Sequence, residues 1–251
     1  MDARRRDGAS RPRALVVSHD PSEVAGRVGL CLERRGYGLD VFVVCPDADR
    51  PVSHTPFPDP GAYDIVVVMG APWSVYDTAT IGTWIGRELD FVRSAHERGV
   101  PYLGICFGAQ VLAAALGGDV HPAPRPEVGW GTVETTAPEL IAPGPWFQWH
   151  RDRFTVPAGA RELARNDVGS QAFRVGRSLG VQFHPEVDGE LLRSWLPADA
   201  PVDPIFDEAG VDPARLLDET DRHAEASRPN VERLVDGFLR ELAVTADTDA
   251  R

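Results

Sequence analysis

The first 116 residues alternate short apolar runs with segments of helical spacing, and this alternation restricts the possible folds most. Four runs rich in apolar residues are predicted as strands: 14–19, 39–44, 65–69 and 102–105. Between and after them lie segments with apolar residues at helical spacing, each followed by a glycine: 24–35, 84–98 and 107–116. Short continuous apolar runs are typical of strands buried on both faces of a parallel sheet. The pattern predicts a doubly wound, mostly parallel α/β sheet with helices on both faces.

Residues 128–183 no longer alternate strand-like and helical segments. Several β-like pieces follow one another there, with few helical segments between them: 131–136, 146–149, 172–175 and 179–183. Strands that follow one another closely along the chain pair most readily in an antiparallel way. We therefore expect antiparallel excursions attached to the parallel core.

After Val187 the sequence turns acidic and helical. Three segments are predicted as helices, with a Pro- and Asp-rich loop at 196–212 between the first and the second: 190–195, 213–226 and 230–243. The last one carries an apolar stripe and is predicted to dock on the core: Val231, Leu234, Val235, Phe238, Leu239 and Leu242. We therefore divide the chain into a disordered basic lead-in (1–13), one α/β domain (14–187) and an acidic helical C-terminal extension (188–251).

Charge and cysteine usage restrict the partners and the compartment. The formal net charge is −12, and an acidic chain repels phosphate backbones, which argues against nucleic acid as a partner. No apolar run approaches the roughly 18 residues that a membrane helix needs, and the N-terminus lacks the apolar stretch of a signal peptide. The three cysteines have no C-x-x-C spacing, which argues against a zinc ribbon or a disulfide framework. We therefore expect a cytoplasmic protein without a metal site.

Residues 104–110 (GICFGAQ) lie between a predicted strand and a predicted helix. A nucleophile at such a turn, here Cys106, occupies a strained, exposed position at the carboxyl end of a sheet. The flanking glycines are needed because side chains there would collide with neighbouring backbone. The helix N-terminus behind Cys106 favours the thiolate. The alternative is that Cys106 is a small buried residue that packs the turn.

Residues 181–186 (VQFHPE) follow a predicted strand and supply a base. Residues two apart in an extended segment face the same way, so His184 and Glu186 can project toward one site. A carboxylate beside an imidazole fixes its tautomer and stabilises its cationic form. The pair would give Cys106 a general base and a group that orients this base. A surface turn is the alternative when the segment is considered alone.

Together these segments resemble a known family. PYLGICFGAQ and VQFHPE are similar to the two signatures of class I glutamine amidotransferase domains. IVVVMGAPWSVYD resembles the oxyanion segment of that family, and EVGWGTV follows the elbow helix at the expected place. FQWHRDRF and QAFRVGRSLGVQFHPE resemble the stand-alone branch that is related to the amidotransferase domain of GMP synthase. The resemblance covers about residues 14–187 and implies a flavodoxin-like fold.

The resemblance also implies a mechanism that needs neither metal nor cofactor. Cys106 would attack the γ-carboxamide of glutamine, His184 would move the protons, and Glu186 would hold His184. Water would then hydrolyse the γ-glutamyl thioester. The backbone N–H groups of Gly70 and Phe107 would hold the oxyanion.

Four further residues are candidates for binding the substrate. Gln110 matches the glutamine of the family motif, and His150 and Asp152 lie in a segment shared with the stand-alone proteins. Glu127 is placed to meet the amino group of the substrate, and a solvated loop carboxylate is the alternative. One departure concerns the oxyanion segment, which often reads Gly-Gly-Pro in the family and here has Ala71 in the middle; the added methyl constrains the backbone there.

Three functions fit these residues. The first is a glutaminase that supplies ammonia to a synthetase on another polypeptide, because the segment after Val187 carries no P-loop. The second is a γ-glutamyl hydrolase or peptidase that cuts γ-glutamyl conjugates with the same residues. The third is a non-catalytic binding module on the same fold, against which the intact Cys106, His184 and Glu186 argue. We place the first slightly ahead of the second.

Overall fold

The computed structural model describes residues 11–22, 24–197 and 202–243. Its centre is an eight-stranded sheet with the strand order β2-β1-β3-β4-β10-β9-β8-β6. The first five are parallel to one another, and the last three continue the sheet in antiparallel pairs. In chain order the strands are β1 Arg13–Ser18, β2 Gly38–Val43, β3 Ile65–Val68, β4 Tyr102–Ile105, β6 Glu134–Thr135, β8 Arg161–Arg165, β9 Ser170–Val175 and β10 Ser178–Val181. The mostly parallel, flavodoxin-like sheet with antiparallel excursions is thereby confirmed.

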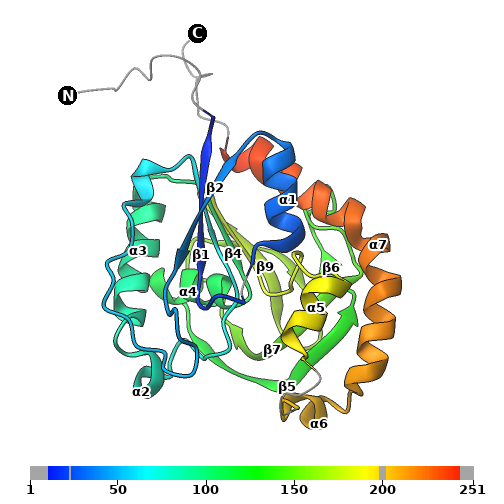
Figure 1. Ribbon diagram of the computed structural model, residues 1–251. Coiled ribbons are helices and arrows are strands. Elements are labelled where there is room, and N and C mark those ends of the chain that lie inside the picture. The colour runs from blue at the N-terminus through cyan, green and yellow to red at the C-terminus, as the bar shows by residue number, and fades with distance from the viewer. Residues whose placement is uncertain (1–10, 23, 198–201, 244–251) are drawn as a thin grey trace, which may run out of the picture.

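Helices cover both faces of this sheet (Figure 1). Helices α1 (Gly26–Arg34) and α7 (Pro213–Phe238) lie on one face, and α3 (Ile85–Glu97) and α4 (Phe107–Ala115) lie on the other. Strand β1 is a continuous apolar run in the sequence because both of its faces are buried. Ala14 and Val16 belong to the core under α1 and α7, whereas Leu15 and Val17 belong to the core under α3 and α4. Both faces of β1 are therefore buried in an apolar core.

A two-stranded antiparallel ribbon, β5 (Val120–Gly131) and β7 (Trp146–Phe154), lies outside the main sheet. It meets the end of β10 where the backbone N–H of His184 donates to the carbonyl of Phe147 at 2.8 Å. Two short helices, α5 (Gly189–Trp195) and α6 (Ile205–Ala209), and the first turns of α7 pack on the ribbon through a separate apolar cluster. The C-terminal segment therefore touches both the ribbon and the main core.

The C-terminal helices differ from the prediction in two places. The predicted helices 213–226 and 230–243 are one helix, α7, which continues through Pro229 and ends in a π-helical turn at Leu239–Ala243. A proline inside a helix costs roughly 3 kcal/mol, but α7 is buried on both sides of Pro229: Leu216 packs in the apolar cluster of the ribbon and Val231 packs in the main core. We attribute the continuous helix to this burial. The predicted loop 196–212 contains α6, because Ile205 and Phe206 are both buried.

Other predictions are confirmed or untested. The apolar stripe of the last helical segment is buried against the core, apart from the half-buried Leu239. Strands β5 and β8, helix α2 (Thr78–Ile81) and a 3-10 turn at Pro60–Ala62 were not predicted, apart from Gly131, the last residue of β5. Residues 1–10, 198–201 and 244–251 lie outside the described residues, so the predictions for most of the lead-in and for the chain end cannot be compared. No helix in the described ranges is long and apolar enough to cross a membrane.

Candidate active site

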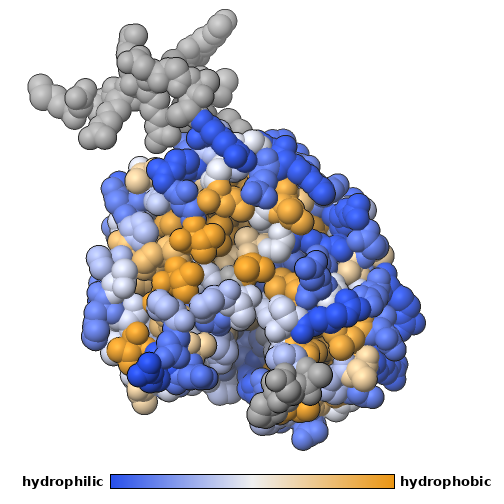
Figure 2. Space-filling view, viewed as in Figure 1, coloured by the Kyte–Doolittle hydropathy of each residue, from blue (hydrophilic) through white to orange (hydrophobic). Residues whose placement is uncertain are grey.

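A pocket of about 300 Å³ opens at the carboxyl ends of the parallel strands. Figure 2 shows the surface hollowed at the lower end of the molecule, where these strand ends point in the same view of Figure 1. Ligands of open α/β sheets bind at this edge. Five of the predicted site residues line the pocket: Cys106, Gln110, His150, Asp152 and His184. The other four predicted residues are not among the lining residues: Gly70, Phe107, Glu127 and Glu186.

Cys106 is held in a strained turn between β4 and α4. Its φ is 50° and its ψ is −105°, and no other non-glycine residue in the described ranges has a positive φ. A side chain at Gly104 would lie 2.5 Å from the backbone of Gly108, and one at Gly108 would lie 2.3 Å from the carbonyl oxygen of Val68. The turn is therefore possible only with these glycines, as the sequence pattern predicted. Such local strain is typical of functional positions.

The sulfur of Cys106 contacts a polar group that was not predicted from the sequence. The side-chain amide of Gln182 donates to Sγ at 3.5 Å, and its oxygen accepts from Nε2 of Gln110 at 3.2 Å. The Cys106 thiol also faces the carbonyl of Trp149 at 3.8 Å. Gln182 precedes His184 by two residues, so the alternation that selected His184 and Glu186 also pointed to Gln182.

His184 and Glu186 form a buried pair beside the cysteine. Nδ1 of His184 lies 2.7 Å from Oε1 of Glu186, and both side chains are almost fully buried. Nε2 of His184 has no hydrogen bond of ordinary geometry to the described residues. Burial lowers the pKa of His184, but the Glu186 carboxylate and the nearby Cys106 sulfur raise it by more, so this pKa lies well above its ordinary value. The ring can therefore stay protonated beside a thiolate.

The peptide groups Met69–Gly70 and Gly70–Ala71 follow strand β3 and lie near the cysteine. The carbonyl of Met69 accepts from the N–H of Gly108 at 3.1 Å, so the N–H of Gly70, across the same planar trans peptide, points away from the elbow. The carbonyl of Gly70 accepts from Nδ1 of His19 at 2.6 Å, so the N–H of Ala71 points away from His19. Ala71 also lines the pocket, whereas Gly70 does not. This arrangement favours Ala71 over Gly70 as the donor on the β3 side.

His19 belongs to a second buried pair. Its Nε2 lies 2.9 Å from Oε1 of Glu88, and both side chains are fully buried. Nδ1 faces a carbonyl oxygen and must carry a proton, so the contact with Glu88 needs either an imidazolium or a protonated carboxyl group. The ring also packs edge-on against Phe107, with 4.7 Å between ring centroids. The pair thus holds both the Gly70–Ala71 peptide and the first residue of α4.

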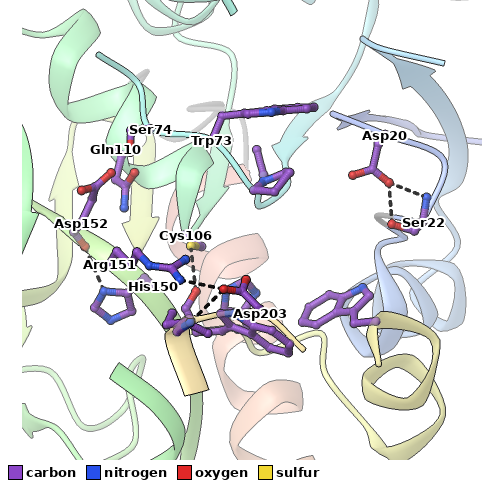
Figure 3. A pocket seen from close by; sticks show the side chains of 16 residues that line it. Asp20, Ser22, Trp73, Ser74, Cys106, Gln110, His150, Arg151, Asp152 and Asp203 are labelled. Carbon is purple, nitrogen blue, oxygen red and sulfur yellow. Dashed lines mark hydrogen bonds and ion pairs between the residues drawn. The ribbon is translucent and has the colours of Figure 1, made fainter. Parts of the chain in front are cut away.

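Strand β7 supplies the other wall of the pocket (Figure 3). Nδ1 of His150 donates to the backbone carbonyl of Asp152 at 2.9 Å, and the carboxylate of Asp152 accepts from the hydroxyl of Tyr76 at 2.8 Å. Glu127 lies behind His150, with 3.1 Å between its Oε2 and Nε2 of the imidazole. Its two oxygens accept from the side-chain amides of Asn166 and Gln171 at 2.7 and 2.9 Å. Glu127 therefore holds the imidazole of His150 in place. Its contact with the amino group of a substrate stays a prediction.

The titratable groups of the described residues are not arranged as a metal site. Within residues 11–22, 24–197 and 202–243, no three His, Cys, Asp or Glu side chains are placed to hold a metal ion. The pocket instead gathers a cysteine, an imidazole with a carboxylate partner, and backbone N–H groups at a helix start. These are the parts required for nucleophilic attack on a carbonyl carbon.

Three comparisons place the chain among known proteins. The family model "Glutamine amidotransferase class-I" matches residues 30–199, more than half of the chain. One subunit of the glutamine-hydrolyzing GMP synthase of Sulfolobus acidocaldarius is 32% identical over 159 residues, which are 60% of this chain and 78% of that protein. A γ-glutamyl-L-1-hydroxyisopropylamide hydrolase of a Pseudomonas species is 33% identical over 147 residues, which are 51% of this chain and 49% of that protein.

The share of each relative that is covered differs. The chain spans about half of the Pseudomonas hydrolase and 26% of the GMP synthase of Thermomicrobium roseum. The solved structure of a glutamine amidotransferase from Thermotoga maritima has the same fold, with a TM-score of 0.77 and 23% identity, over 93% of this chain and 100% of that one. With the matched family model, these likenesses show that the chain belongs to the class I glutamine amidotransferase family.

Proposed function

We propose that this protein is a cysteine-dependent amidase that hydrolyses γ-glutamyl amides through a thioester on Cys106. Three groups that meet at one pocket carry the proposal. A cysteine on a strained elbow and an imidazole with an unbonded nitrogen line the pocket, and a carboxylate next to the imidazole holds it. This arrangement has the order nucleophile, base and orienting group.

The reaction follows from these positions. The Cys106 thiolate attacks the γ-carbonyl carbon, and the C–N bond breaks as Nε2 of His184 gives its proton to the leaving amine. His184 then takes a proton from water, and the resulting hydroxide attacks the thioester carbon and releases glutamate. Glu186 stabilises the imidazolium in both steps. The sum is one amide and one water converted into glutamate and an amine.

Backbone and side-chain donors complete the proposed roles. The N–H of Phe107, the first residue of α4, has no partner within its own helix and can donate to the oxyanion, together with the N–H of Ala71 or Gly70. Gln110 and Asp152 lie on one side of Cys106 and would bind the amino-acid end of the glutamyl group (Figure 3). His150, held by Glu127, would support that wall.

The leaving amine decides between two candidate functions. Glutamine releases ammonia, which a separate synthetase would consume; the similarity to one subunit of a GMP synthase supports this candidate. A γ-glutamyl conjugate releases a larger amine, and a specific observation favours it. Trp195, Asp203 and Ile205 of the C-terminal segment line the pocket beside the proposed nucleophile, so that segment helps to shape the space around the substrate.

The test is covalent labelling with 6-diazo-5-oxo-norleucine, a glutamine-shaped electrophile, followed by intact-protein and peptide mass spectrometry. A single adduct on Cys106, absent in Cys106→Ala, is the expected result. Cys31 and Cys45 are internal controls, because burial raises the pKa of both thiols, that of Cys45 to about 11. Turnover of glutamine or of a γ-glutamyl amide by the Cys106→Ala variant would overturn the proposed nucleophile.

A further inference from the structure

We infer that the leaving-group side of the pocket selects amines that carry a second, positively charged group. The inference rests on the proposed function and adds a substrate class to it: γ-glutamyl amides of diamines and similar cations. Three residues carry it, namely Asp20, Ser22 and Trp195.

The chemistry of His184 determines where the leaving amine lies. Its nitrogen must receive the proton of Nε2, so the amine passes beside His184. Trp195 lies there, with 5.6 Å between its ring centroid and that of His184, and it lines the pocket. The start of α1, just after the loop that carries Asp20 and Ser22, reaches the same side, because the N–H of Arg27 donates to the carbonyl of Glu186 at 3.0 Å.

Figure 3 shows the two sides of the pocket. Gln110 and Asp152 lie on one side of Cys106, and Asp20 and Ser22 lie on the opposite side. A glutamyl group bound to Gln110 and Asp152 would therefore direct its amide substituent toward Asp20.

The side chains on the leaving-group side suit an ammonium group. Asp20 is only 6% exposed, and its Oδ1 accepts from the backbone N–H of Ser22 at 2.7 Å and from the Ser22 hydroxyl. The carboxylate is thereby held at the pocket wall. Trp195 adds an aromatic ring, and an ammonium group is attracted both by a carboxylate and by the face of an indole.

The remaining charges of the pocket disfavour an anionic amine. Arg151 is the single arginine or lysine among the described lining residues, and two carboxylates neutralise it. Its Nη2 lies 2.6 Å from Oδ1 of Asp203, and its Nε lies 3.1 Å from Oε2 of Glu208. The carboxylates of Asp20 and Asp152 have no cationic partner of this kind in the described ranges. A leaving amine with a carboxylate, such as an amino acid, would meet repulsion.

The experiment compares three γ-glutamyl amides of equal chain length whose amines are 1,4-diaminobutane, butylamine and 4-aminobutanoate. We expect kcat/KM to be highest for the cationic amide, at least about tenfold above the neutral one, and lowest for the anionic one. Asp20→Asn should reduce the cationic-to-neutral ratio toward 1. Because each ratio is measured within one preparation, it does not depend on the fraction of folded protein.

A matched control and the outcomes complete the design. Asp90→Asn removes an exposed carboxylate on α3, and it should leave the ratio as in the wild type. Equal kcat/KM for the three amides, or a ratio that Asp20→Asn does not change, would overturn the inference while the proposed function stands. Failure of the proposed function looks different, because then no γ-glutamyl amide is turned over and Cys106 takes no adduct.

Discussion

Two histidine–glutamate pairs of the described residues have both side chains almost fully buried, and they differ in what surrounds the imidazole. His184 and Glu186 are two residues apart in one segment, whereas His19 and Glu88 come from the end of β1 and from α3, 69 residues apart. Both pairs have a nitrogen within 3 Å of a carboxylate oxygen, and all four side chains are buried.

The pairs differ in their second nitrogen. Nδ1 of His19 is bonded to the carbonyl of Gly70, so both nitrogens of this ring are engaged. Nε2 of His184 has no bond of ordinary geometry to the described residues and faces the pocket side, near Cys106. A proton can leave and return at His184 without breaking the fold, whereas at His19 the same event would leave a buried group unpaired. The open nitrogen is therefore the feature that favours the proposed catalytic role for His184 and a structural role for His19.

Replacement of His184 should have the largest effect. His184→Ala removes the proposed proton carrier, and we expect kcat/KM to fall by at least about 100-fold, within the range for general acid–base groups. The rate of Cys106 alkylation by iodoacetamide near pH 7 should fall as well, because the thiolate loses its cationic partner. An unchanged alkylation rate would contradict the proposal that His184 stabilises the Cys106 thiolate, and with it the proposed difference between the two pairs.

Replacement of His19 should act on stability. His19→Ala leaves Glu88 buried without its partner, and breaking such a pair costs about 3–5 kcal/mol in the free energy of unfolding. His19→Gln keeps a donor for the carbonyl of Gly70 and should cost less. Urea denaturation measures both variants. A His19→Ala protein of wild-type stability would contradict the structural role of this pair.

The two glutamates allow a matched comparison with one isosteric change. Glu186→Gln can still accept a hydrogen bond from Nδ1 of His184 but no longer balances its charge, so kcat should fall less than in His184→Ala, by under about 100-fold. Glu88→Gln should leave the alkylation rate of Cys106 near the wild-type value, because Glu88 does not touch the pocket. Steady-state rates and the rate of iodoacetamide labelling of Cys106 are measured for both variants. Equal effects of the two substitutions would show that the pairs do not differ in function.

The smallest expected effect is a pH dependence of stability. The pKa of His184 is raised in the folded protein, so this group adds stability that is fully present below its unfolded pKa of about 6.5. That contribution is lost as the pH rises through the raised pKa. The difference in unfolding free energy between the wild type and His184→Gln should therefore shrink from pH 6 toward alkaline pH. A difference that grows with pH would contradict the direction of the shift.

Local patterns predicted most of the parallel half of the fold. The apolar runs became β1 to β4, and the glycines around Cys106 predicted its turn, because both depend on neighbours in the chain. The two-residue spacing of His184 and Glu186 also predicted their contact. The end of the helix near residue 226 was predicted wrongly, because Pro229 is unfavourable locally while burial against the ribbon before it and against the core after it stabilises one continuous helix.

By itself, the sequence determined the fold class, the candidate nucleophile Cys106, and Glu186 as the partner of the candidate base His184. Each of these depends on residues that lie close together in the chain. Only the tertiary structure decided which distant groups meet at the pocket. It joined His19 to Glu88, placed Trp195 of the C-terminal segment beside His184, and bonded the carbonyl of Gly70 to His19, which favours the N–H of Ala71 over that of Gly70 as the proposed donor. Contacts between distant residues depend on packing and on the orientation of peptide planes, and neither has a signature in local spacing.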